Sequence, residues 1–529
     1  MKRFSGEVAN GYGVTGVYVP RAAPETAANA NANATGLASP EKQPPGAEAP
    51  RSHTKPAVWP QFLAACVVNL NTFAFGSSMV WPAMALPQLQ SAEDGVVSLP
   101  LTVDEGSWVS SLLAVAAVVF TPVFSGLTEF VPRKPFGYLT VAPLLVSWIL
   151  KIASTNTGYL YIARILAGIN AAASLVLPSI YVSEIASNEV RGALGCLLGL
   201  ISNSGVLFSY VVGAYLPYSA VLYLNLVPLL LFAVGFAFLP ETPYWLAKKR
   251  QYPEARQSLR WLRRGITEDQ LEHEMALIEA SLGRHKAKAG ADAGADTGAE
   301  RPALERQACS RAAVVGLCLI VMVAVNQQLC GLFAVINYAV FIFEEGGNAL
   351  SPELATIIMG VLQVAGGAVS TPLMDYVGRR TIFFVTNVFA SASLIALGAY
   401  FYLRTETATD VSSVGWLPVL CLSLFVMVMA VGPGPLPYVL VMELVAPRLR
   451  GLASVLGFCT IWGLAALMSK LYPFMSDAMG EYGSFWFFAA VSIACTVVGL
   501  AALPETKGRP LDSILRDLNG GRSVFTVSS

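Results

Sequence analysis

Acidic and basic residues recur at a fixed spacing, each time at the end of a hydrophobic segment. Glu184 stands seven residues before Arg191, and Glu443 stands seven residues before Arg450. A carboxylate and a guanidinium can form an ion pair, and a partly solvated pair costs little free energy to separate. The chemistry of these residues is therefore reversible ion pairing, which suits a gate that opens and closes.

Two more signatures are repeated in the same order. An acid four residues before a basic residue occurs at Glu129 and again at Asp375, and the triplet Pro-Glu-Thr occurs at 240–242 and again at 504–506. Signatures repeated in one order indicate an internal duplication, with the charged segment ends of both halves on one face.

The predicted gate consists of the acids and bases of these signatures: Glu129, Arg133, Glu184, Arg191, Asp375, Arg379, Arg380, Glu443 and Arg450. We expect the acids to bridge the arginines between neighbouring helix ends when the cytoplasmic side is closed. In the alternative interpretation the basic residues serve only as topology signals, but this leaves the fixed spacing of the acids unexplained.

Composition requires most of the chain to lie in a membrane. The sequence is 55% hydrophobic and only 13% charged, about half the charge that a soluble chain needs. Hydrophobic runs of about 20 residues can cross a bilayer, and they must do so as helices. We find such runs near 61–87, 107–127, 136–155, 159–183, 193–216, 219–239, 312–343, 353–374, 381–403, 415–442, 452–475 and 484–503.

The expected fold is an all-α membrane protein of twelve transmembrane helices in two six-helix halves. Short amphipathic helices are expected in the central loop at 254–265 and 271–282, followed by a low-complexity linker at 287–300. The predicted regions are a disordered cytoplasmic tail at 1–58, a first half at 59–239, a cytoplasmic loop at 240–311, a second half at 312–505 and a cytoplasmic tail at 506–529.

The distribution of Lys and Arg predicts the orientation. Loops on one side of the predicted spans carry twenty basic residues, whereas the opposite loops carry only Lys151, Arg404 and Lys470. Because basic loops stay on the cytoplasmic side, both termini are expected in the cytoplasm.

Several other functions find no support in the sequence. The eight cysteines lie in or beside the spans without paired spacing in outer loops, so free thiols are expected. With three histidines and no Cys/His cluster, no metal site or cofactor is expected. The chain also lacks a phosphate-binding loop and a nucleophile elbow. We therefore expect neither an enzyme nor a nucleic-acid-binding protein.

The order of these motifs resembles the sugar porter family of the major facilitator superfamily. The resemblance covers roughly residues 60–515 and is carried by the motifs at 129–134, 164–168, 178–184, 191–192, 240–243, 327–331, 375–380, 432–437 and 504–508. The segments at 105–108 and 469–470, with Asn203 and Gly205, are most similar to the arthropod branch of facilitated trehalose-transporter-like proteins.

The resemblance implies a sugar site near the middle of the membrane, between the two halves. The residues in the matching positions are Gln327, Gln328, Asn337, Tyr338, Gln363, Tyr438 and Trp462. Side-chain amides offer both donors and acceptors to sugar hydroxyls, and an indole ring suits the apolar face of a pyranose. We expect Asn337 and Tyr338 about three turns beyond Gln327 on one helix, in an outer lid. The glutamines could instead join helices, and the aromatic residues could serve only in packing.

Some positions depart from the family pattern toward lower polarity. Phe333 stands where the family usually has Asn, Ala430 replaces an acid, Gly199 replaces a Gln, and Ile461 and Ala465 flank Trp462 where the glucose branch has Asn. Each lost hydroxyl partner costs about 1 kcal/mol or more of binding.

The sequence thus predicts a facilitative transporter of a sugar such as trehalose or glucose, working by alternating access in the plasma membrane. No acid lies in the first span, which favours uniport over proton coupling. The expected partners are the solute and the lipid bilayer. Two alternatives are a transporter of a less polar solute and a non-transporting sugar sensor on the same fold.

Overall fold

The computed structural model describes residues 57–91, 100–187, 189–293, 311–347, 350–407, 411–446 and 449–518. Helices and turns make up this part of the chain, which contains no strand. The predicted N-terminal tail lies outside the described residues except for its last two positions. Of the predicted linker at 287–300, the first residues belong to a helix that reaches Ala293, and the rest lie outside the described residues.

The first half consists of helices that match the six predicted spans. Their bounds are α1 Trp59–Gln90, α2 Val103–Leu127, α3 Arg133–Ile152, α4 Thr157–Ser174 with α5 Val176–Ile185, α6 Arg191–Tyr215 and α7 Tyr218–Phe238. The central loop contains α8 Pro243–Lys248, α9 Tyr252–Leu262 and α10 Glu268–Ala293.

The second half repeats this pattern with more interruptions. Its helices are α12 Arg311–Leu329, α13 Leu332–Asn337, α14 Ala339–Gly346, α15 Pro352–Val377, α16 Arg379–Thr405, α17 Leu417–Val431, α18 Leu436–Leu444 and α19 Arg450–Ala502. A 3-10 turn at Ser412–Val414 precedes α17, and a short helix, α20 Leu511–Arg516, follows the half.

Helix α19 contains two spans. Its 53 residues would reach about 80 Å if straight, whereas the hydrocarbon core is about 30 Å thick. Gly480 interrupts it with φ 73° and ψ 165°, a conformation that favours glycine because a side chain would clash with the backbone. The described residues hold eleven helices long and apolar enough to cross a membrane, α19 among them, so the count of spans reaches the predicted twelve.

Three spans are broken near the middle of the bundle. The first-half break separates α4 from α5 at Leu175, and the second-half breaks lie at Gly331, between α12 and α13, and around Gly432, between α17 and α18. Gly331 has φ +86°, and a Cβ atom there would lie 2.5 Å from the ring of Phe488. A residue with a side chain would therefore strain the backbone and collide with that ring.

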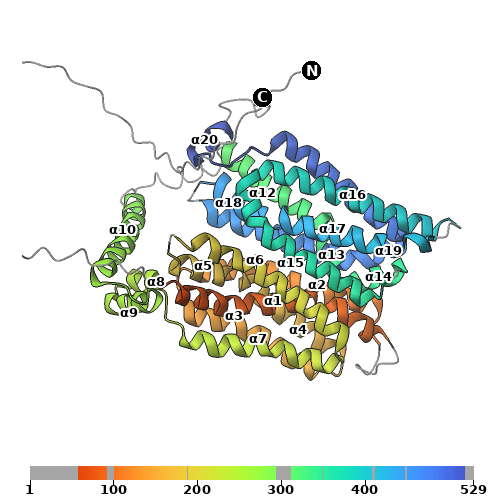
Figure 1. The fold of residues 1–529 in the computed structure, drawn as a ribbon, viewed down its shortest axis with the longest axis horizontal. Helices are drawn as coiled ribbons and strands as arrows, with labels where there is room; N and C mark the ends of the chain where they lie inside the picture. The colour runs from red at the N-terminus through yellow and green to blue at the C-terminus, as the bar shows by residue number, and fades with distance from the viewer. Residues whose placement is uncertain are drawn as a thin grey trace, which may run out of the picture. The chain divides into compact units, whose positions relative to one another are not determined.

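Packing follows the two halves (Figure 1). In the first half α1 packs on α6 and α7, and α4 packs on α2 and α3. In the second half α19 packs on α12 and α16, and α17 packs on α15 and α16. The halves meet mainly along α2 with α19 and α6 with α15, and α1 also contacts α13 and α14.

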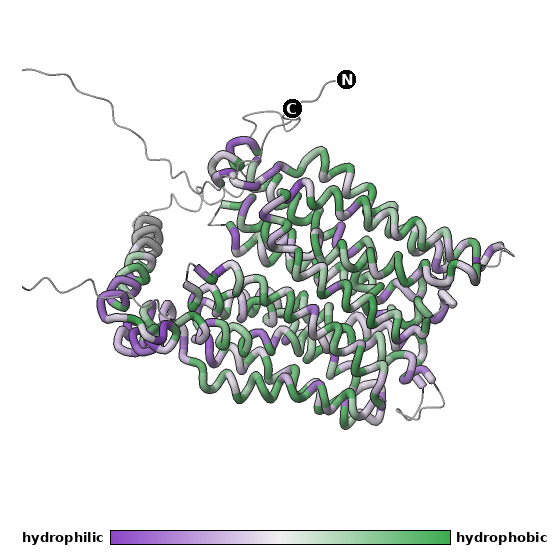
Figure 2. Tube along the Cα trace, viewed as in Figure 1, coloured by the Kyte–Doolittle hydropathy of each residue, from purple (hydrophilic) through white to green (hydrophobic). Residues whose placement is uncertain are grey.

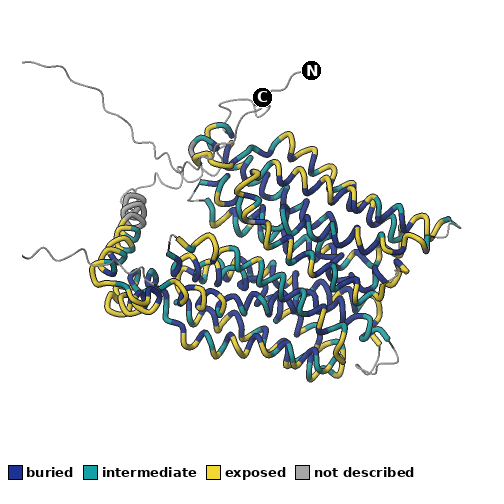
Figure 3. The backbone as a smooth tube through the Cα atoms, in the orientation of Figure 1, coloured by how far each residue is buried: buried dark blue, intermediate teal, exposed yellow. Residues whose placement is uncertain are grey.

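The surface pattern is inverted relative to a soluble protein. Figure 2 shows hydrophobic residues along the helices of both halves, and Figure 3 shows that one side of α7 and of α16 is exposed. Leu231 and Phe238 of α7 are 56% and 79% exposed, while Asn71 and Asn170 are buried and bonded to each other. Such an apolar exterior is stable against lipid rather than water.

The two ends of the bundle differ in which helices begin there. The loop end is the end at which α3 and α16 begin, at Arg133 and Arg379, next to α8. The far end is the end at which α2 and α15 begin, at Val103 and Pro352.

Candidate functional site

The glutamines of the predicted sugar site are buried inside the bundle. Gln327 and Gln328 lie in the last turn of α12, just before the break at Gly331, and Gln363 lies on α15. All three are at most 7% exposed. The Nε2 group of Gln327 donates a weak hydrogen bond of 3.4 Å to the carbonyl of Gly434, in the break between α17 and α18.

The side-chain oxygens of these glutamines lack donors. Among the described residues, Oε1 of Gln327, Gln328 and Gln363 is buried and accepts no hydrogen bond. A buried acceptor without a donor costs about 1–3 kcal/mol. These three oxygens can therefore accept hydrogen bonds from a ligand with hydroxyl groups, which would remove that cost.

Gln363 also connects the two halves. Its Nε2 group donates to Oδ1 of Asn203 on α6 at 3.2 Å. The sequence singled out Asn203 only as a mark of one branch of the resembling family. Its position opposite Gln363 makes it a further candidate for the site, and no sequence signal indicated this pairing.

An aromatic cluster surrounds Trp462. Its ring meets Phe75 of α1 edge-on at 6.0 Å and Phe333 of α13 edge-on at 6.2 Å, measured between ring centroids. Trp462 thus touches both halves, and it is 7% exposed. Phe333 occupies the position where the resembling family has Asn, so the wall beside Trp462 is apolar.

Tyr438 lies on the loop-end side of the break in the tenth span. It belongs to α18, and its ring packs on Phe458 of α19 at 5.1 Å. Tyr438 and Trp462 therefore pack against different aromatic side chains.

Asn337 and Tyr338 do not continue the helix of Gln327. Because Gly331 breaks the span, Asn337 ends α13 and Tyr338 lies between α13 and α14, so the expectation of a single helix was wrong. The hydroxyl of Tyr338 donates to the carbonyl of Ser469 at 3.1 Å. Asn337 is fully buried and donates to the carbonyl of Phe333 at 2.8 Å.

At the loop end of the first half, the central ion pair joins Arg133 and Glu184. Nη2 of Arg133 lies 2.7 Å from Oε1 of Glu184, and both side chains are at most 10% exposed. The guanidinium also stacks over Trp245 at 4.6 Å, and Thr242 donates a hydrogen bond of 2.5 Å to Glu184.

The loop end of the second half repeats this arrangement. Nη2 of Arg379 lies 3.0 Å from both Glu443 and Asp375, and the hydroxyl of Thr506 donates to Glu443 at 2.6 Å. Thr506 therefore holds Glu443 as Thr242 holds Glu184.

The repeated Pro-Glu-Thr triplet completes both arrangements. Glu241 accepts hydrogen bonds from the backbone N–H groups of Arg133 and Lys134, and Glu505 accepts them from those of Arg379 and Arg380. A carboxylate at a helix N-terminus satisfies donors that have no partner within the helix. Through these hydrogen bonds, each triplet joins the end of its half to the start of α3 or α16.

Other members of the predicted gate have different partners. Glu129 pairs with Lys248 of α8 at 3.0 Å. Arg191 donates to the carbonyl of Ala186, and Arg450 donates to the carbonyls of Met442 and Val445. Within the part of the chain that the structure describes, neither Arg191 nor Arg450 is paired with an acid, and the ion pairs of the predicted gate join helices of one half or a half with its own loop.

Arg380 is the remaining member, and its guanidinium donates to the carbonyl of Leu500 at 2.6 Å. It therefore ties the start of α16 to the last span of the same half.

The charged contact between the halves lies toward the far end, whereas Gln363 with Asn203 and the Cys459 thiol with the carbonyl of Val118 join the halves nearer the middle. Nζ of Lys470 on α19 lies 2.6 Å from Oδ1 of Asp104 and 2.8 Å from the hydroxyl of Ser107 on α2, and it stacks over Trp108. The hydroxyl of Tyr210 on α6 donates to the carbonyl of Ile336 at 2.9 Å. The segments 105–108 and 469–470 resemble one branch of the family, and Asp104 and Lys470 beside and within them carry opposite charges, the one feature of the sequence that points to this pair.

The loop end of α6 and α19 lacks such contacts. A Cβ atom added at Gly195, Gly199 or Gly451 would meet no other atom within 4 Å, whereas one at Gly367 would lie 2.5 Å from Asn203 of the other half. The described contacts between the halves therefore run from the far end to the middle of the bundle, and the halves are separate where these three loop-end glycines lie.

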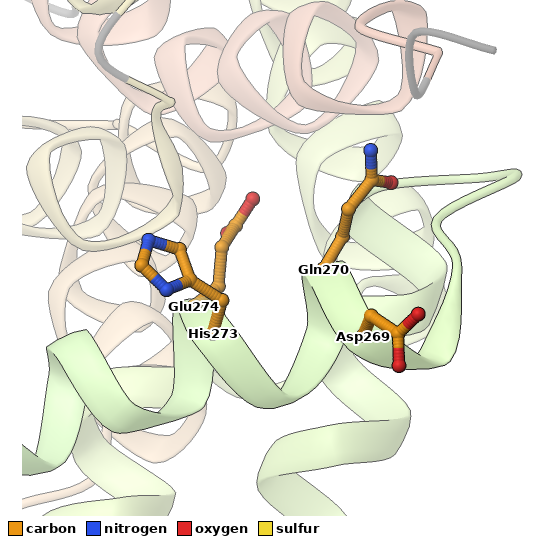
Figure 4. A pocket seen from close by; sticks show the side chains of 4 residues that line it. All are labelled: Asp269, Gln270, His273 and Glu274. Carbon is orange, nitrogen blue, oxygen red and sulfur yellow. The ribbon is translucent and has the colours of Figure 1, made fainter. Parts of the chain in front are cut away.

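A pocket on the central loop is separate from this site. It has a volume of about 340 Å³ and is lined by Asp269, Gln270, His273 and Glu274 of α10 (Figure 4). Glu274 lies 3.3 Å from Nε of Arg263, so the arginine balances the charge of this carboxylate. No group of three or more His, Cys, Asp or Glu side chains suited to a metal occurs among the described residues.

Two six-helix halves, buried amides between them and contacts that close one end define a membrane transporter of the major facilitator class. The chain belongs to the family described as sugar (and other) transporter, which matches residues 61–518. The family predicted from the sequence is thus confirmed.

Relatives with curated descriptions lead to the same family. The chain is 30% identical over 474 residues to a facilitated trehalose transporter of Bombyx mori, covering 89% of both chains. It is also 30% identical to the facilitated trehalose transporters of Anopheles gambiae and Aedes aegypti, but it spans only 59% and 57% of their lengths.

Solved structures share the fold. The xylose transporter XylE of E. coli, in a partially occluded inward-open conformation, superposes with a TM-score of 0.66 at 18% identity, covering 85% of this chain and 99% of that chain. An inward-open structure of the same transporter gives a TM-score of 0.64 at 20% identity, covering 86% and 99%. At this identity the likeness concerns the fold alone, and it confirms the expected two-half helical architecture.

Proposed function

We propose that this chain is a facilitative sugar uniporter that works by alternating access in the plasma membrane, with the loop end and both termini in the cytoplasm. The observation that carries the proposal is the set of buried, unpaired amide oxygens of Gln327, Gln328 and Gln363. Sugar hydroxyls are the donors that these acceptors lack. Membership of the sugar transporter family and the relatives described as trehalose transporters support trehalose or a glucose-like sugar as the solute.

The concentration of Lys and Arg at the loop end supports the orientation, since basic loops remain on the cytoplasmic side. With this orientation the described contacts between the halves close the outer side. Transport then requires the halves to part at Lys470 and Asp104 and to approach each other at the loop end.

Uniport is supported by the surroundings of Arg164, which is fully buried on α4. Its guanidinium donates to the carbonyls of Ser78 and Val109 at 2.7 Å and of Ser110 at 3.4 Å. Backbone carbonyls do not titrate, so this arrangement offers no proton carrier, and α1 contains no acid.

A second candidate solute is a less polar one. The edge-on cluster of Trp462, Phe75 and Phe333 favours it, because the two phenylalanine rings offer sugar hydroxyls no hydrogen-bond partner. A molecule with one hydroxylated end and one apolar end would match the glutamines and the aromatic rings together.

Uptake of labelled solutes into oocytes tests the proposal. Trehalose, glucose, fructose, polyols and alkyl glucosides are measured side by side, with surface protein quantified. We expect saturable uptake of at least one sugar. Uptake of none of them, with normal surface protein, would contradict the proposal, and sugar binding without uptake would instead support a sensor.

A further inference from the structure

A lysine that pairs with no acid among the described residues lies buried at the far end of the first half. Lys151 belongs to the last turn of α3 and is 1% exposed. Its ammonium nitrogen lies 3.7 Å from the ring centre of Trp148 and 4.3 Å from that of Trp81. The rings attract the cation, but they accept no ordinary hydrogen bond from it.

The groups around Lys151 are donors as well. Among the described residues, Nζ of Lys151, Nε1 of Trp81, Nε1 of Trp148 and the hydroxyl of Tyr218 are all buried without a hydrogen-bond partner. Trp81 and Tyr218 are ring neighbours at 6.3 Å. Around the cation these unpaired groups are mainly donors, since of the four only the Tyr218 hydroxyl can also accept a hydrogen bond.

No described acid compensates the charge. Neither Lys151 nor Arg164 is paired with a carboxylate in the described part of the chain. A buried cation without a counter-charge is destabilising. An anion would reduce this destabilisation and accept the hydrogen bonds.

A cavity provides space for such an anion. It has a volume of about 610 Å³ between α1, α3 and α7, and Gln88, Lys151, Ser154, Tyr218 and Tyr223 are among the residues that line it. It belongs to the first half alone, whereas the glutamines of the sugar site lie on α12 and α15 of the second half.

One wall of the cavity reaches the apolar exterior. Tyr223 is 58% exposed, and the same helix continues with Val227, Leu230 and Val234, which are 47%, 53% and 61% exposed. These positions follow one another at three- and four-residue intervals, so they share a face of α7. The cavity therefore adjoins a surface suited to acyl chains.

We propose that this cavity binds a phosphate group, with Lys151 as its cation and the Tyr218 hydroxyl as a further donor. Phosphate supplies both the negative charge and several acceptor oxygens. It can come from a phospholipid headgroup whose acyl chains lie along α7, or from free phosphate. The site is independent of the proposed transport function.

The test uses purified full-length protein and native mass spectrometry. Bound phosphatidylglycerol is counted during titration in detergent, and diacylglycerol with the same acyl chains serves as the ligand without phosphate. Lys151→Met removes the charge at similar length. Lys249→Met is the matched control, because Lys249 also stacks on a tryptophan ring, at 5.1 Å, but is exposed.

We expect one saturable phosphatidylglycerol site in the wild type and in Lys249→Met, weakened at least tenfold in Lys151→Met, and no such site for diacylglycerol. Tyr218→Phe should weaken it about threefold, since it removes one neutral donor. In a parallel arm, inorganic phosphate is added during thermal unfolding. Stabilisation of the wild type but not of Lys151→Met, without a lipid site, identifies free phosphate as the source.

The proposal is overturned if the wild type shows neither a saturable phospholipid site nor stabilisation by phosphate, a result that needs no variant. Equal binding by the wild type and Lys151→Met overturns it too. If Lys151→Met does not fold, two other variants replace it. Lys151→Arg should keep the site, and Tyr218→Phe should weaken it. Unchanged binding in Tyr218→Phe contradicts the assignment of this hydroxyl as a donor.

Discussion

Lys470 and Asp104 form an ion pair of 2.6 Å that joins the two halves at the far end, between α19 and α2. The lysine has further partners in the hydroxyl of Ser107 and the ring of Trp108. The loop-end pairs of Arg133 with Glu184 and Arg379 with Glu443, by contrast, each lie within one half. The two ends therefore use ion pairs differently: the far-end pair connects the two halves, and the loop-end pairs each hold one half together.

The first prediction concerns the far-end pair. Asp104→Asn removes the charge opposite Lys470 and should destabilise the state closed at this end. Because Asp104 is 61% exposed, the loss is about 0.2–1 kcal/mol, and sugar uptake should change by a factor of about 1.4 to 5. Uptake per surface molecule measures this.

The control for the far-end pair is Glu272→Gln, which breaks an exposed pair with Arg256 between two loop helices and should leave uptake unchanged. The double charge reversal, Asp104→Lys with Lys470→Asp, should recover part of the rate. Equal uptake in the wild type and in Asp104→Asn would show that the pair does not contribute to gating.

The second prediction compares the two loop-end pairs. In Glu184→Gln, Arg133 keeps no acid partner, whereas in Glu443→Gln, Arg379 keeps Asp375 at 3.0 Å. Removing one partner of a buried pair costs about 3–5 kcal/mol, so Glu184→Gln should lower the unfolding temperature much more than Glu443→Gln. Thermal unfolding of the purified variants distinguishes the two. Equal shifts would indicate that Asp375 does not support Arg379.

The third prediction concerns the removal of an amide from the sugar site. Gln328→Leu removes a donor and an acceptor with little change in volume, so KM for the transported sugar should rise severalfold to about a hundredfold, equivalent to about 1–3 kcal/mol. Gln257→Leu on the exposed surface of α9 is the control. If Gln328→Leu reaches the surface and transports every sugar normally, the glutamines only join helices.

The fourth prediction concerns the apolar wall beside Trp462. Phe333→Asn introduces an amide where the resembling glucose transporters have one, so the preference for glucose over less polar solutes should increase. Because Phe333 is only 4% exposed, the loss of its ring should also cost stability, about 3 kcal/mol. The ratio of glucose to alkyl glucoside uptake in the same cells corrects for reduced expression. An unchanged ratio would place the substrate away from this wall.

The fifth prediction concerns energy coupling. Arg164 donates to backbone carbonyls and α1 has no acid, so no group is placed to carry a proton with the sugar. Voltage-clamped oocytes should show no substrate-evoked inward current that grows as external pH falls. Such a current would establish proton coupling instead of uniport.

The sequence by itself determined the class of protein. The low charge fraction and the hydrophobic runs required membrane helices, and the repeated signatures around Glu184 and Glu443 revealed the duplication. These features are local: the length of an apolar run and the order of motifs can be read without knowing which helices touch. The family and the positions of the buried glutamines followed from the same local information.

The tertiary structure decided which charges meet. Sequence spacing suggested Arg191 and Arg450 as gate partners, but the start of α3 packs beside α5, so Arg133 is the residue that reaches Glu184. Likewise, the last turn of α3 is covered by neighbouring helices, which buries Lys151, a residue whose charge alone favours an exposed position. Partner choice and burial depend on contacts between segments far apart in the chain, and the residues adjacent in sequence carry no record of them.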